Sequence, residues 1–442
     1  MNFKRKIALI MVVLLISVMV LNGCGGSSGG GTTSEGEKKK DPVSISLWSG
    51  YPEYDEWLAK MKEGYIAENP HVSIEITSFP LRDYETKIAA AIPARNCSDI
   101  ITIAASYAIR YIEGGMILKA PQDMVSLVLS DAYPKEIAAL AMYNGDVYGV
   151  PHKLTNAALF YNTEMFKEAG LTEPPKSLDD FVEYAKKLAK FDENGNLIRS
   201  GLSLRLTGGG SGLAEKFWYF TMQEGSGIVK EVSPGKYIAD YNNEGGLNAL
   251  RLYMNILYRD KTCNAEIKSD AAGFEAEATA MLIRESWVIG DIAEKAPDLP
   301  YDTAPLPYAT IGVANNFYVT NSAKGDEIDT SWDFVRFIMR PENHKQQVVM
   351  SGWHPCRLDL DLEDYFEEVP QYRNFFMDYE EVHVYPVIAE FDEILTKFAN
   401  HLCNEAYVSP DFLGNDTKMM EFLNRCAAET NEILKANGHL AE

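Results

Sequence analysis

The stretch that decides the fold is Tyr143–Asn144–Gly145–Asp146–Val147–Tyr148–Gly149–Val150–Pro151, followed by Leu159–Phe160–Tyr161–Asn162. Asn144–Gly145 is a turn signal, and the Val and Tyr residues that follow it favour extended backbone. Pro151 fixes its own φ and keeps the preceding residue extended, while residues 159–161 predict a second, buried strand. A chain that passes between two short extended segments in this way predicts a hinge between two lobes.

Before this hinge, strand and helix patterns alternate along the chain. Apolar and polar side chains alternate in the expected strands, and apolar residues recur at helical spacing between them. The expected strands are 43–48, 72–76 and 99–103, and the expected helices are 57–66 and 81–92. This order predicts an α/β fold with a mainly parallel sheet flanked by helices. Ligands of such sheets bind beyond the carboxyl ends of the strands, here residues 48–51, 79–82 and 105–107.

After the hinge, further patterns predict a second set of elements. Ser177 and Asp180 form a near capping box at the start of one helix, and Pro305–Leu306–Pro307 marks a second crossing. The run Thr207–Gly212 lacks the Lys of a phosphate-binding loop and predicts a surface loop, and residues 192–196 predict a turn. Helices are expected within 178–188, 247–258, 332–338, 386–403 and 415–436, and strands at 278–283 and 316–319.

Length and charge limit the possible functions. A chain of 442 residues is too long for one ordinary core, so two domains are expected. The net charge of −23, with no basic stripe, argues against binding of nucleic acid or anionic lipid by the folded part. It is compatible with neutral or cationic ligands.

The N-terminus carries a targeting signal. Lys4–Arg5–Lys6 precedes an apolar run over residues 7–21, which is short for a membrane span, and Leu21–Asn22–Gly23–Cys24 follows. This resembles a bacterial lipoprotein signal, although a residue smaller than Asn22 is commoner in that motif. The resemblance implies a signal peptide over 1–23 and a lipid on Cys24. An uncleaved anchor helix is the alternative. The Gly- and Ser-rich residues 24–41 then form a flexible tether at the outer face of a cell membrane, extracellular or periplasmic.

The remaining cysteines show no metal-binding spacing. Free thiols are the favoured interpretation, with one disulfide as the alternative. No cofactor or metal site is expected. These cysteines are Cys97, Cys263, Cys356, Cys403 and Cys426.

Several segments together resemble extracellular solute-binding proteins of ABC importers, in the maltose-binding-protein group. The likeness spans roughly residues 43–435, and the hinge stretch with Phe166–Leu171 is its strongest part. The other segments are Trp48–Gly50, Ser98–Ile101, Gly114–Leu118, Ala280–Leu282 with Trp287, Phe334–Ile338 with Pro341–Glu342, and Ser351–Pro355.

The resemblance implies a type II periplasmic-binding-protein fold whose two lobes close on a solute. Each lobe is expected to be a mainly parallel sheet flanked by helices, and a multi-strand hinge is expected to join them. The expected N-terminal lobe comprises residues 42–150 and 309–355, and the C-terminal lobe comprises 151–308 and 356–442. It also implies a monomer that delivers the solute to the permease subunits of an ABC transporter. In this family the residue at the Trp287 position often stacks on a sugar. Glu285 stands where the family usually has Gly, and the residues around Tyr107 do not support maltose specificity.

A carbohydrate site needs aromatic rings and polar groups at their rims. Core packing is a serious alternative for Trp48 and Trp218, a surface ion pair for Arg82, a solvated charge for Glu53, and a turn for Asn156. The candidate ligand-binding residues are Trp48, Tyr51, Glu53, Arg82, Tyr107, Asn156, Trp218, Glu285, Trp287, Trp353 and Arg357.

The sequence therefore predicts a lipid-anchored binding protein for a carbohydrate, without catalytic residues. The HExxH and GxSxG motifs are absent, and no feature selects a carboxylate pair suited to glycoside hydrolysis. A peptide or cationic solute remains the alternative ligand, partly because of Glu285. A carbohydrate-active enzyme and a surface sensor are further alternatives.

Overall fold

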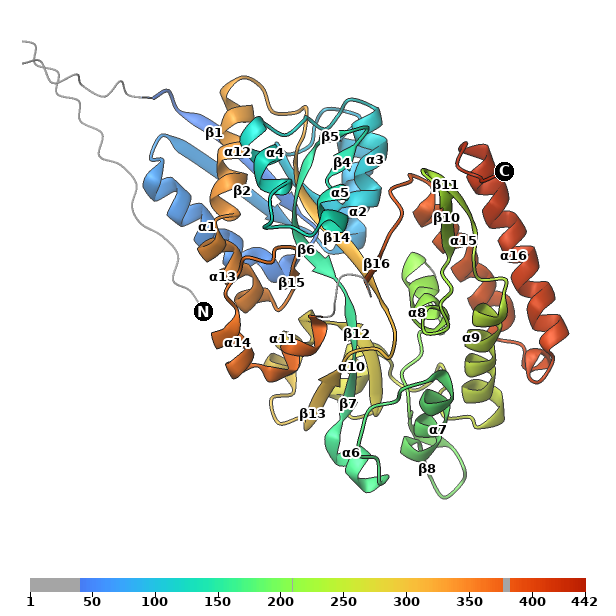
Figure 1. Cartoon of the computed structure of the whole chain (residues 1–442). Helices are drawn as coiled ribbons and strands as arrows, with labels where there is room; N and C mark the ends of the chain where they lie inside the picture. The colour runs from blue at the N-terminus through green and yellow to red at the C-terminus, as the bar shows by residue number, and fades with distance from the viewer. Residues whose placement is uncertain (1–39, 209, 377–381) are drawn as a thin grey trace, which may run out of the picture. The chain divides into compact units, whose positions relative to one another are not determined.

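The computed structural model describes residues 40–208, 210–376 and 382–442. The predicted signal peptide, the predicted lipidation site Cys24 and nearly all of the predicted tether lie outside these residues. Residues Pro42–Glu442 belong to one structural unit, shown in Figure 1. Of the helices in the described ranges, none combines the length and apolar character that a membrane span requires.

The larger sheet is built around three parallel strands. β1 (Val43–Ser49) lies between β2 (Val72–Ser78) and β3 (Ile100–Ala104) and is parallel to both, as predicted. β14 (Thr310–Val319) is antiparallel to β3 and to β6 (Gly149–Thr155). The pairing is therefore more mixed than predicted, because β6 and β14 enter the sheet from later passages of the chain. The sheet is completed by β15 (His354–Pro355), antiparallel to β6, and β16 (Val382–Val384), parallel to β14.

The smaller sheet has β7 (Ala157–Asn162) at its centre, antiparallel to both of its neighbours. The prediction of a mainly parallel sheet in each lobe is wrong for this sheet, because sequence alternation does not encode the direction in which strands pair. The neighbours are β12 (Met281–Glu285) and β13 (Tyr301–Ala304). Short antiparallel pairs join β4 (Met142–Tyr143) to β5 (Asp146–Val147), β8 (Lys190–Phe191) to β9 (Leu197–Arg199), and β10 (Val229–Ser233) to β11 (Lys236–Ala239).

Helices surround both sheets (Figure 1). Their ends follow local sequence: the Ser177 hydroxyl accepts a hydrogen bond from the Asp180 amide, and Gly352 ends another helix in the left-handed region at φ 69°. The helices are α1 (Asp55–Glu68), α2 (Leu81–Ala91), α3 (Ala105–Glu113), α4 (Gln122–Val128), α5 (Lys135–Ala139), α6 (Thr163–Glu168), α7 (Leu178–Leu188), α8 (Ser211–Met222), α9 (Glu244–Met254), α10 (Asp270–Glu275), α11 (Trp287–Lys295), α12 (Asp326–Ile338), α13 (Pro341–Ser351), α14 (Glu363–Glu368), α15 (Phe391–His401) and α16 (Asp416–Ala436). Shorter helical segments are η1 (Pro52–Tyr54), η2 (Asn255–Arg259), η3 (Pro370–Phe375), η5 (Leu402–Ala406) and η6 (Pro410–Phe412).

The hinge stretch folds as a turn followed by a strand, as its sequence indicates. Asn144 and Gly145 both have positive φ, which lets them join β4 to β5. Pro151 lies inside β6, opposite Asn316, where the register with β14 shifts. A bulge of this kind tolerates the missing N–H of proline.

The chain passes from the larger sheet to the smaller one at Asn156, between β6 and β7. The boundary predicted at residues 150/151 thus falls inside β6. Residues 305–309, between β13 and β14, make the second connection, where the proline pair predicted it. After β15 the chain returns to the smaller sheet, where the Thr303 hydroxyl of β13 donates to the Gln371 carbonyl of η3. β16 then pairs with β14 again.

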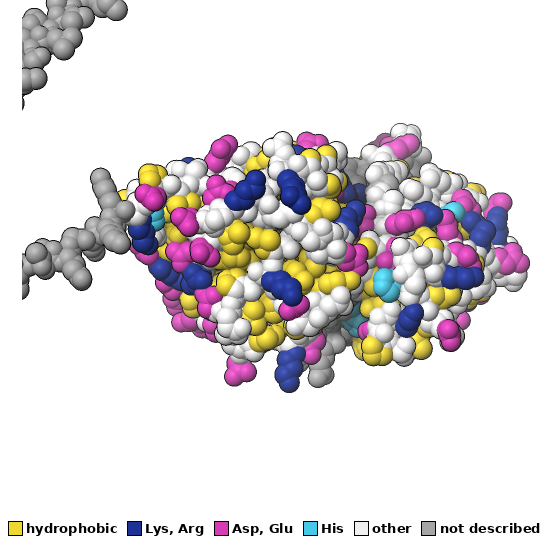
Figure 2. Space-filling model, turned by 90° about the horizontal axis from the view of Figure 1, so that it is seen from above, with side chains coloured by type: hydrophobic (Ala, Val, Ile, Leu, Met, Phe, Trp, Pro, Cys, Tyr) yellow, Lys and Arg dark blue, Asp and Glu magenta, His cyan; other side chains and the backbone are white. Residues whose placement is uncertain are grey.

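Each sheet has its own buried clusters. Ile45, Leu47 and Phe334 belong to a cluster on one face of the larger sheet, where α1 and α12 pack. Phe160 of β7 packs with Phe274 of α10 at the smaller sheet. The five cysteines outside the signal region are free thiols, which agrees with the favoured prediction. Figure 2 shows acidic and basic side chains interspersed on one face.

Candidate functional site

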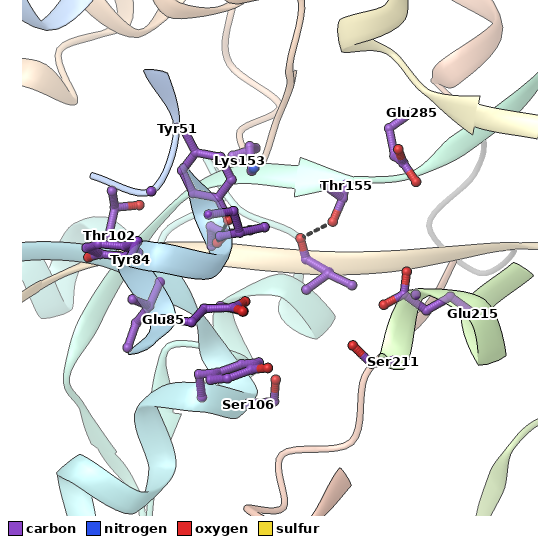
Figure 3. A pocket seen from close by; sticks show the side chains of 18 of the residues that line it. Tyr51, Tyr84, Glu85, Thr102, Ser106, Lys153, Thr155, Ser211, Glu215 and Glu285 are labelled. Carbon is purple, nitrogen blue, oxygen red and sulfur yellow. Dashed lines mark hydrogen bonds between the residues drawn. The ribbon is translucent and has the colours of Figure 1, made fainter. Parts of the chain in front are cut away.

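A cavity of about 410 Å³ lies between the larger sheet and the elements α8, β12 and α11 (Figure 3). On the larger-sheet side it is lined by residues that follow β1, β2 and β3, including Tyr51, Arg82 and Tyr107. These are the carboxyl ends of the parallel strands, where the sequence predicted a ligand site. Its size is that of a small-molecule pocket.

The cavity brings together many of the residues that the sequence proposed for ligand binding. They come from segments next to both sheets, although more than 230 positions separate Glu53 from Glu285 along the chain. Those that line it are Tyr51, Glu53, Arg82, Tyr107, Glu285, Trp287 and Trp353. Their binding roles stay predictions, but their convergence is a property of the structure.

Two predicted tryptophans lie outside the lining. The half-buried Trp48 ring packs edge-on against Phe79 at 5.7 Å between centroids, with the Lys87 ammonium 4.4 Å from its ring. Trp218 is 4% exposed and stacks on Tyr385 at 5.6 Å. The structure therefore gives both tryptophans packing partners, which is the alternative that the sequence left open for them.

Two predicted polar residues also lie outside the lining. Asn156 is buried where β6 passes to β7, and its amide donates to the Phe375 carbonyl. The guanidinium of Arg357 is buried and donates to Asp359 and to the Met339 carbonyl. Each side chain holds a backbone carbonyl of a distant segment, and neither is among the residues that line the cavity.

Lys153, which the sequence analysis did not propose, is enclosed by aromatic rings at the larger-sheet side. Its Nζ lies 3.4 Å from the centroid of the Tyr51 ring and 3.6 Å from that of Trp353. We call Lys153, Tyr51 and Trp353 the lysine cage. The Tyr51 hydroxyl donates to Asn315 at 2.7 Å, and Trp353 Nε1 donates to Glu53 at 2.9 Å, so both rings are held from outside as well.

Strand register explains why Lys153 stands there. In β6 it is opposite Asn315 of β14 and Pro355 of β15, and opposed residues share a face of the sheet. Burial lowers the pKa of Lys153 to about 7, against the opposing pull of Glu53 and Glu285. The signal in the sequence was a lone Lys in an otherwise buried strand.

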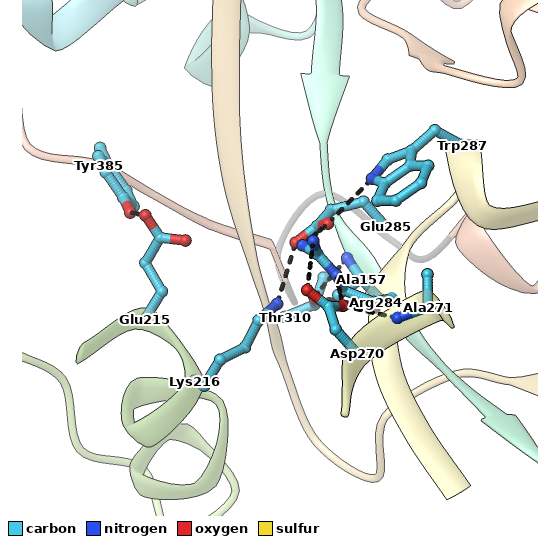
Figure 4. Close-up of polar contacts among 10 residues, drawn as sticks. All are labelled: Ala157, Glu215, Lys216, Asp270, Ala271, Arg284, Glu285, Trp287, Thr310 and Tyr385. Atoms are coloured by element: carbon cyan, nitrogen blue, oxygen red, sulfur yellow. Dashed lines mark hydrogen bonds and ion pairs between the residues drawn. The ribbon is translucent and has the colours of Figure 1, made fainter. Parts of the chain in front are cut away.

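A cluster of charged groups lies on the smaller-sheet side (Figure 4). Glu285 accepts from Lys216 at 3.1 Å, from Arg284 at 2.5 Å and from Trp287 Nε1 at 3.2 Å. Arg284 also pairs with Asp270 at 2.5 Å. We call Asp270, Arg284, Glu285 and Lys216 the Glu285 cluster.

The Glu285 cluster is internally neutralised. Burial alone would raise the pKa of Glu285, but Arg284 and Lys216 hold it well below its ordinary value. Burial lowers the pKa of Lys216, which Glu285 opposes. The bond to Trp287 Nε1 fixes the indole at the start of α11, at the edge of the cavity.

A third group of side chains closes the cavity between α2, α3 and α15. The Tyr107 hydroxyl is hydrogen-bonded to Asp392, and Arg82 pairs with Glu85 at 3.0 Å. Burial raises the pKa of Glu85, with Arg82 opposing and Asp392 adding to the shift. These residues offer carboxylate oxygens and guanidinium N–H groups at the rim.

The start of α8 also reaches the cavity, through Ser211 and Gly212. Ser211 is buried, although the sequence predicted a surface loop for the run that ends there. A Cβ added to Gly210 would stand 3.4 Å from an Arg82 nitrogen, so α2 and the start of α8 approach closely. Gly210 has φ 72°, in the left-handed region that favours glycine. Glu215 and Tyr219 of α8, together with Tyr385, complete this side.

Comparisons with known proteins agree with this arrangement. The family model described as bacterial extracellular solute-binding protein matches residues 60–374. The arabinooligosaccharide-binding protein of Bacillus subtilis is 21% identical over 403 residues, which cover 85% of this chain and 86% of that protein.

Solved structures show the same fold. The GacH receptor of Streptomyces glaucescens, solved unliganded and with acarbose, matches with a TM-score of 0.75 at 18% identity, covering 90% of this chain and 99% of that one. UgpB of Mycobacterium tuberculosis in complex with glycerophosphocholine matches with a TM-score of 0.73 at 16% identity, covering 89% and 100%. The predicted two-lobed α/β fold is thereby confirmed.

Proposed function

The chain belongs to the bacterial extracellular solute-binding proteins, and from this premise we propose that it captures a carbohydrate in the cavity between its two sheets. The observation that carries the proposal is the convergence of aromatic rings with hydrogen-bonding rims. Tyr51 and Trp353 face the cavity from the larger sheet and Trp287 from the smaller one. Sugars present flat apolar faces and many hydroxyls, which such a lining accommodates.

The charges of the lining favour a neutral, hydroxyl-rich solute over a cationic one. Glu285 is saturated by Lys216, Arg284 and Trp287, so it has little left to offer an ammonium group. Glu53 already accepts from Trp353. Because protein cations and indole N–H groups already balance these carboxylates, the site does not need a positively charged solute to neutralise them.

An adjoining cavity supports an oligosaccharide rather than a single sugar. It has a volume of about 260 Å³ and shares Arg205, Tyr219 and Arg284 with the first cavity. The arabinooligosaccharide-binding relative and the acarbose-bound structure have ligands of this length class by name. A solute of more than one ring can place its second ring there.

We also propose how the protein is anchored and where it delivers its solute. Cys24 carries a lipid that anchors the chain at the outer face of the membrane, and the loaded protein delivers its solute to an ABC permease. Binding proceeds by approach of the two lobes and involves no chemical step. Incorporation of a labelled fatty acid into the protein tests the anchor separately from solute binding. We expect the wild type to incorporate the label and Cys24→Ala not to.

A thermal-shift screen tests the proposed ligand. The panel holds arabinotriose, mannobiose, maltotriose, acarbose, glycerophosphocholine, a tripeptide and spermidine, each at 1 mM as an order-of-magnitude choice. We expect an oligosaccharide to raise the melting temperature, because a ligand that binds only the folded state stabilises it by mass action. Stabilisation by spermidine or the tripeptide alone would contradict the carbohydrate assignment. Release of product from a bound sugar would contradict the binding-only assignment.

A further inference from the structure

Lys153 is a buried charge without a hydrogen-bonding partner. Its side chain has 0% exposure, and its Nζ has no acceptor within hydrogen-bond distance among the described residues. Burying an ammonium group is costly unless something stabilises it. The two ring faces of the lysine cage are what the structure provides, at 3.4 and 3.6 Å.

The arrangement fits a charged ammonium better than a neutral amine. A cation over a ring face is attracted by the negative face of the π system, most strongly when water is excluded. The Tyr51 and Trp353 centroids are 6.2 Å apart with the ring planes at 72°, and the nitrogen lies between them. A neutral amine lacks this attraction and offers its lone pair to the same electron-rich faces.

Both rings line the solute cavity, so the lysine acts on the site through them. We propose that Lys153 is a positioning residue. Its ammonium form holds Tyr51 and Trp353 in the orientation that receives the solute, and its neutral form leaves the rings with only their hydrogen bonds to Asn315 and Glu53, which loosens that orientation. This inference rests on the proposed function for the nature of the solute. It deepens that function by making capture depend on pH.

The protonation change falls in a physiological range, because burial lowers the pKa of Lys153 to about 7. Affinity is therefore expected to be high below pH 7 and to fall as the pH rises through it. The groups that face Lys153 are Glu53 from η1, Glu285 from β12, Cys356 after β15, Tyr51, Tyr54 and the adjacent His152.

The pKa values of His152, Cys356 and Glu285 are all shifted away from pH 7. Burial lowers the pKa of His152 well below its ordinary value and raises that of Cys356 well above its own. Arg284 and Lys216 hold the pKa of Glu285 low against its burial. A transition near pH 7 at the cage is thus assignable to Lys153.

The first arm of the test needs no solute. Tryptophan fluorescence of the purified chain is followed from about pH 5.5 to 9, a range that lies between the ordinary pKa values of His and Lys side chains. Three variants are compared with the wild type: Lys153→Met, Trp353→Phe and Lys119→Met. Lys119 is exposed and pairs with Asp146 away from the cavity, so the last variant controls for loss of one positive charge.

A transition near pH 7 in the wild type and in Lys119→Met, absent from Lys153→Met and Trp353→Phe, is the expected result. Absence of the transition in the wild type, or its survival in Lys153→Met, would overturn the inference. This arm decides the role of Lys153 even if no carbohydrate of the panel binds.

The second arm measures affinity for the panel oligosaccharide that stabilises the wild type most, by calorimetry at pH 6 and pH 8. Wild type and Lys119→Met are expected to bind about tenfold more weakly at pH 8, as one proton-linked step across two pH units allows. Lys153→Met is expected to bind at the weaker level at both pH values. Equal affinity of wild type at both pH values, with a transition present in the first arm, would overturn the coupling to capture while leaving the proposed function intact.

Discussion

The two sides of the cavity handle a buried charge in opposite ways. On the smaller-sheet side, Glu285 is surrounded by two cations and an indole N–H. On the larger-sheet side, Lys153 has ring faces on two sides and no acceptor for its Nζ among the described residues. Both charged groups hold tryptophans that line the same cavity, Trp287 and Trp353.

One side of the cavity is thus held by a neutralised cluster, and the other by a charge that can change. A neutralised cluster keeps its charges over a wide pH range. Removing one member lowers the free energy of unfolding strongly, because the other members are then buried and unpaired. A cation held by ring faces is weakly stabilised, and its charge can change near neutral pH. We expect the Glu285 cluster to be a rigid support and the lysine cage to be adjustable.

The largest effect is expected from Glu285→Gln. The change leaves Lys216 and Arg284 without their shared carboxylate, at a cost of about 3 kcal/mol in the free energy of unfolding. Urea denaturation at pH 7 measures it. The matched control is Glu68→Gln, which breaks a pair with Arg340 whose side chains are 52% and 44% exposed, and which is worth less than about 1 kcal/mol.

The difference in unfolding free energy between wild type and Glu285→Gln should depend on pH. The folded pKa of Glu285 lies below its ordinary value, so its stabilisation is present above that ordinary value and fades as the pH falls below it. The gap between wild type and Glu285→Gln should therefore narrow on acidification. Equal effects of Glu285→Gln and Glu68→Gln at pH 7 would show that the cluster is not a rigid support.

Lys153→Met is expected to act in the opposite direction. A drop in the pKa from 10.5 to about 7 corresponds to roughly 5 kcal/mol against the charged form. Replacing the ammonium group by an apolar side chain removes this cost, so the variant should be more stable than wild type at pH 6, although it captures solute less well.

The extra stability of Lys153→Met over wild type should shrink as the pH rises. Between the folded pKa of about 7 and the ordinary 10.5, the unfolded chain binds more protons at Lys153 than the folded one, so wild-type stability rises relative to the variant. Denaturation at pH 6 and pH 9 compares the two values, with Lys119→Met alongside. Destabilisation by Lys153→Met at pH 6 would identify the lysine as ordinary structural support.

The smallest effect is expected from Tyr107→Phe, which removes a hydrogen bond to Asp392 between α3 and α15. One such bond contributes about 1 kcal/mol, so affinity for the chosen oligosaccharide should fall by no more than about fivefold. Stability should hardly change. A loss as large as that of a cavity tryptophan would place Tyr107 in direct contact with the solute instead.

Local sequence predicted the elements well and their assembly less well. The first three strands, the turn at Asn144–Gly145 and the cap at Ser177 follow from neighbouring residues, and all of them are present. The antiparallel entry of β14 and β6 depends on contacts between segments more than 150 positions apart, which periodicity does not encode.

The site shows the same limit. Tyr51, Arg82 and Tyr107 could be proposed because they follow the ends of predicted parallel strands. For Trp218, the sequence could not distinguish a ligand-binding role from packing in the core, because its helix is buried on nearly every side. Lys153 was missed because its importance comes from register with Asn315 and Pro355, which only the folded sheet reveals.

The cavity between the sheets is proposed to hold a carbohydrate against its tryptophans. Calorimetric titration of the best-binding oligosaccharide into wild type, Trp287→Ala and Trp48→Ala separates solute contact from packing, since both rings are half-buried but only Trp287 lines the cavity. We expect Trp287→Ala to weaken binding by about 30-fold, as for an aromatic residue that stacks on the solute, and Trp48→Ala to leave affinity within about twofold. Equal losses in the two variants, or none in Trp287→Ala, would contradict the account.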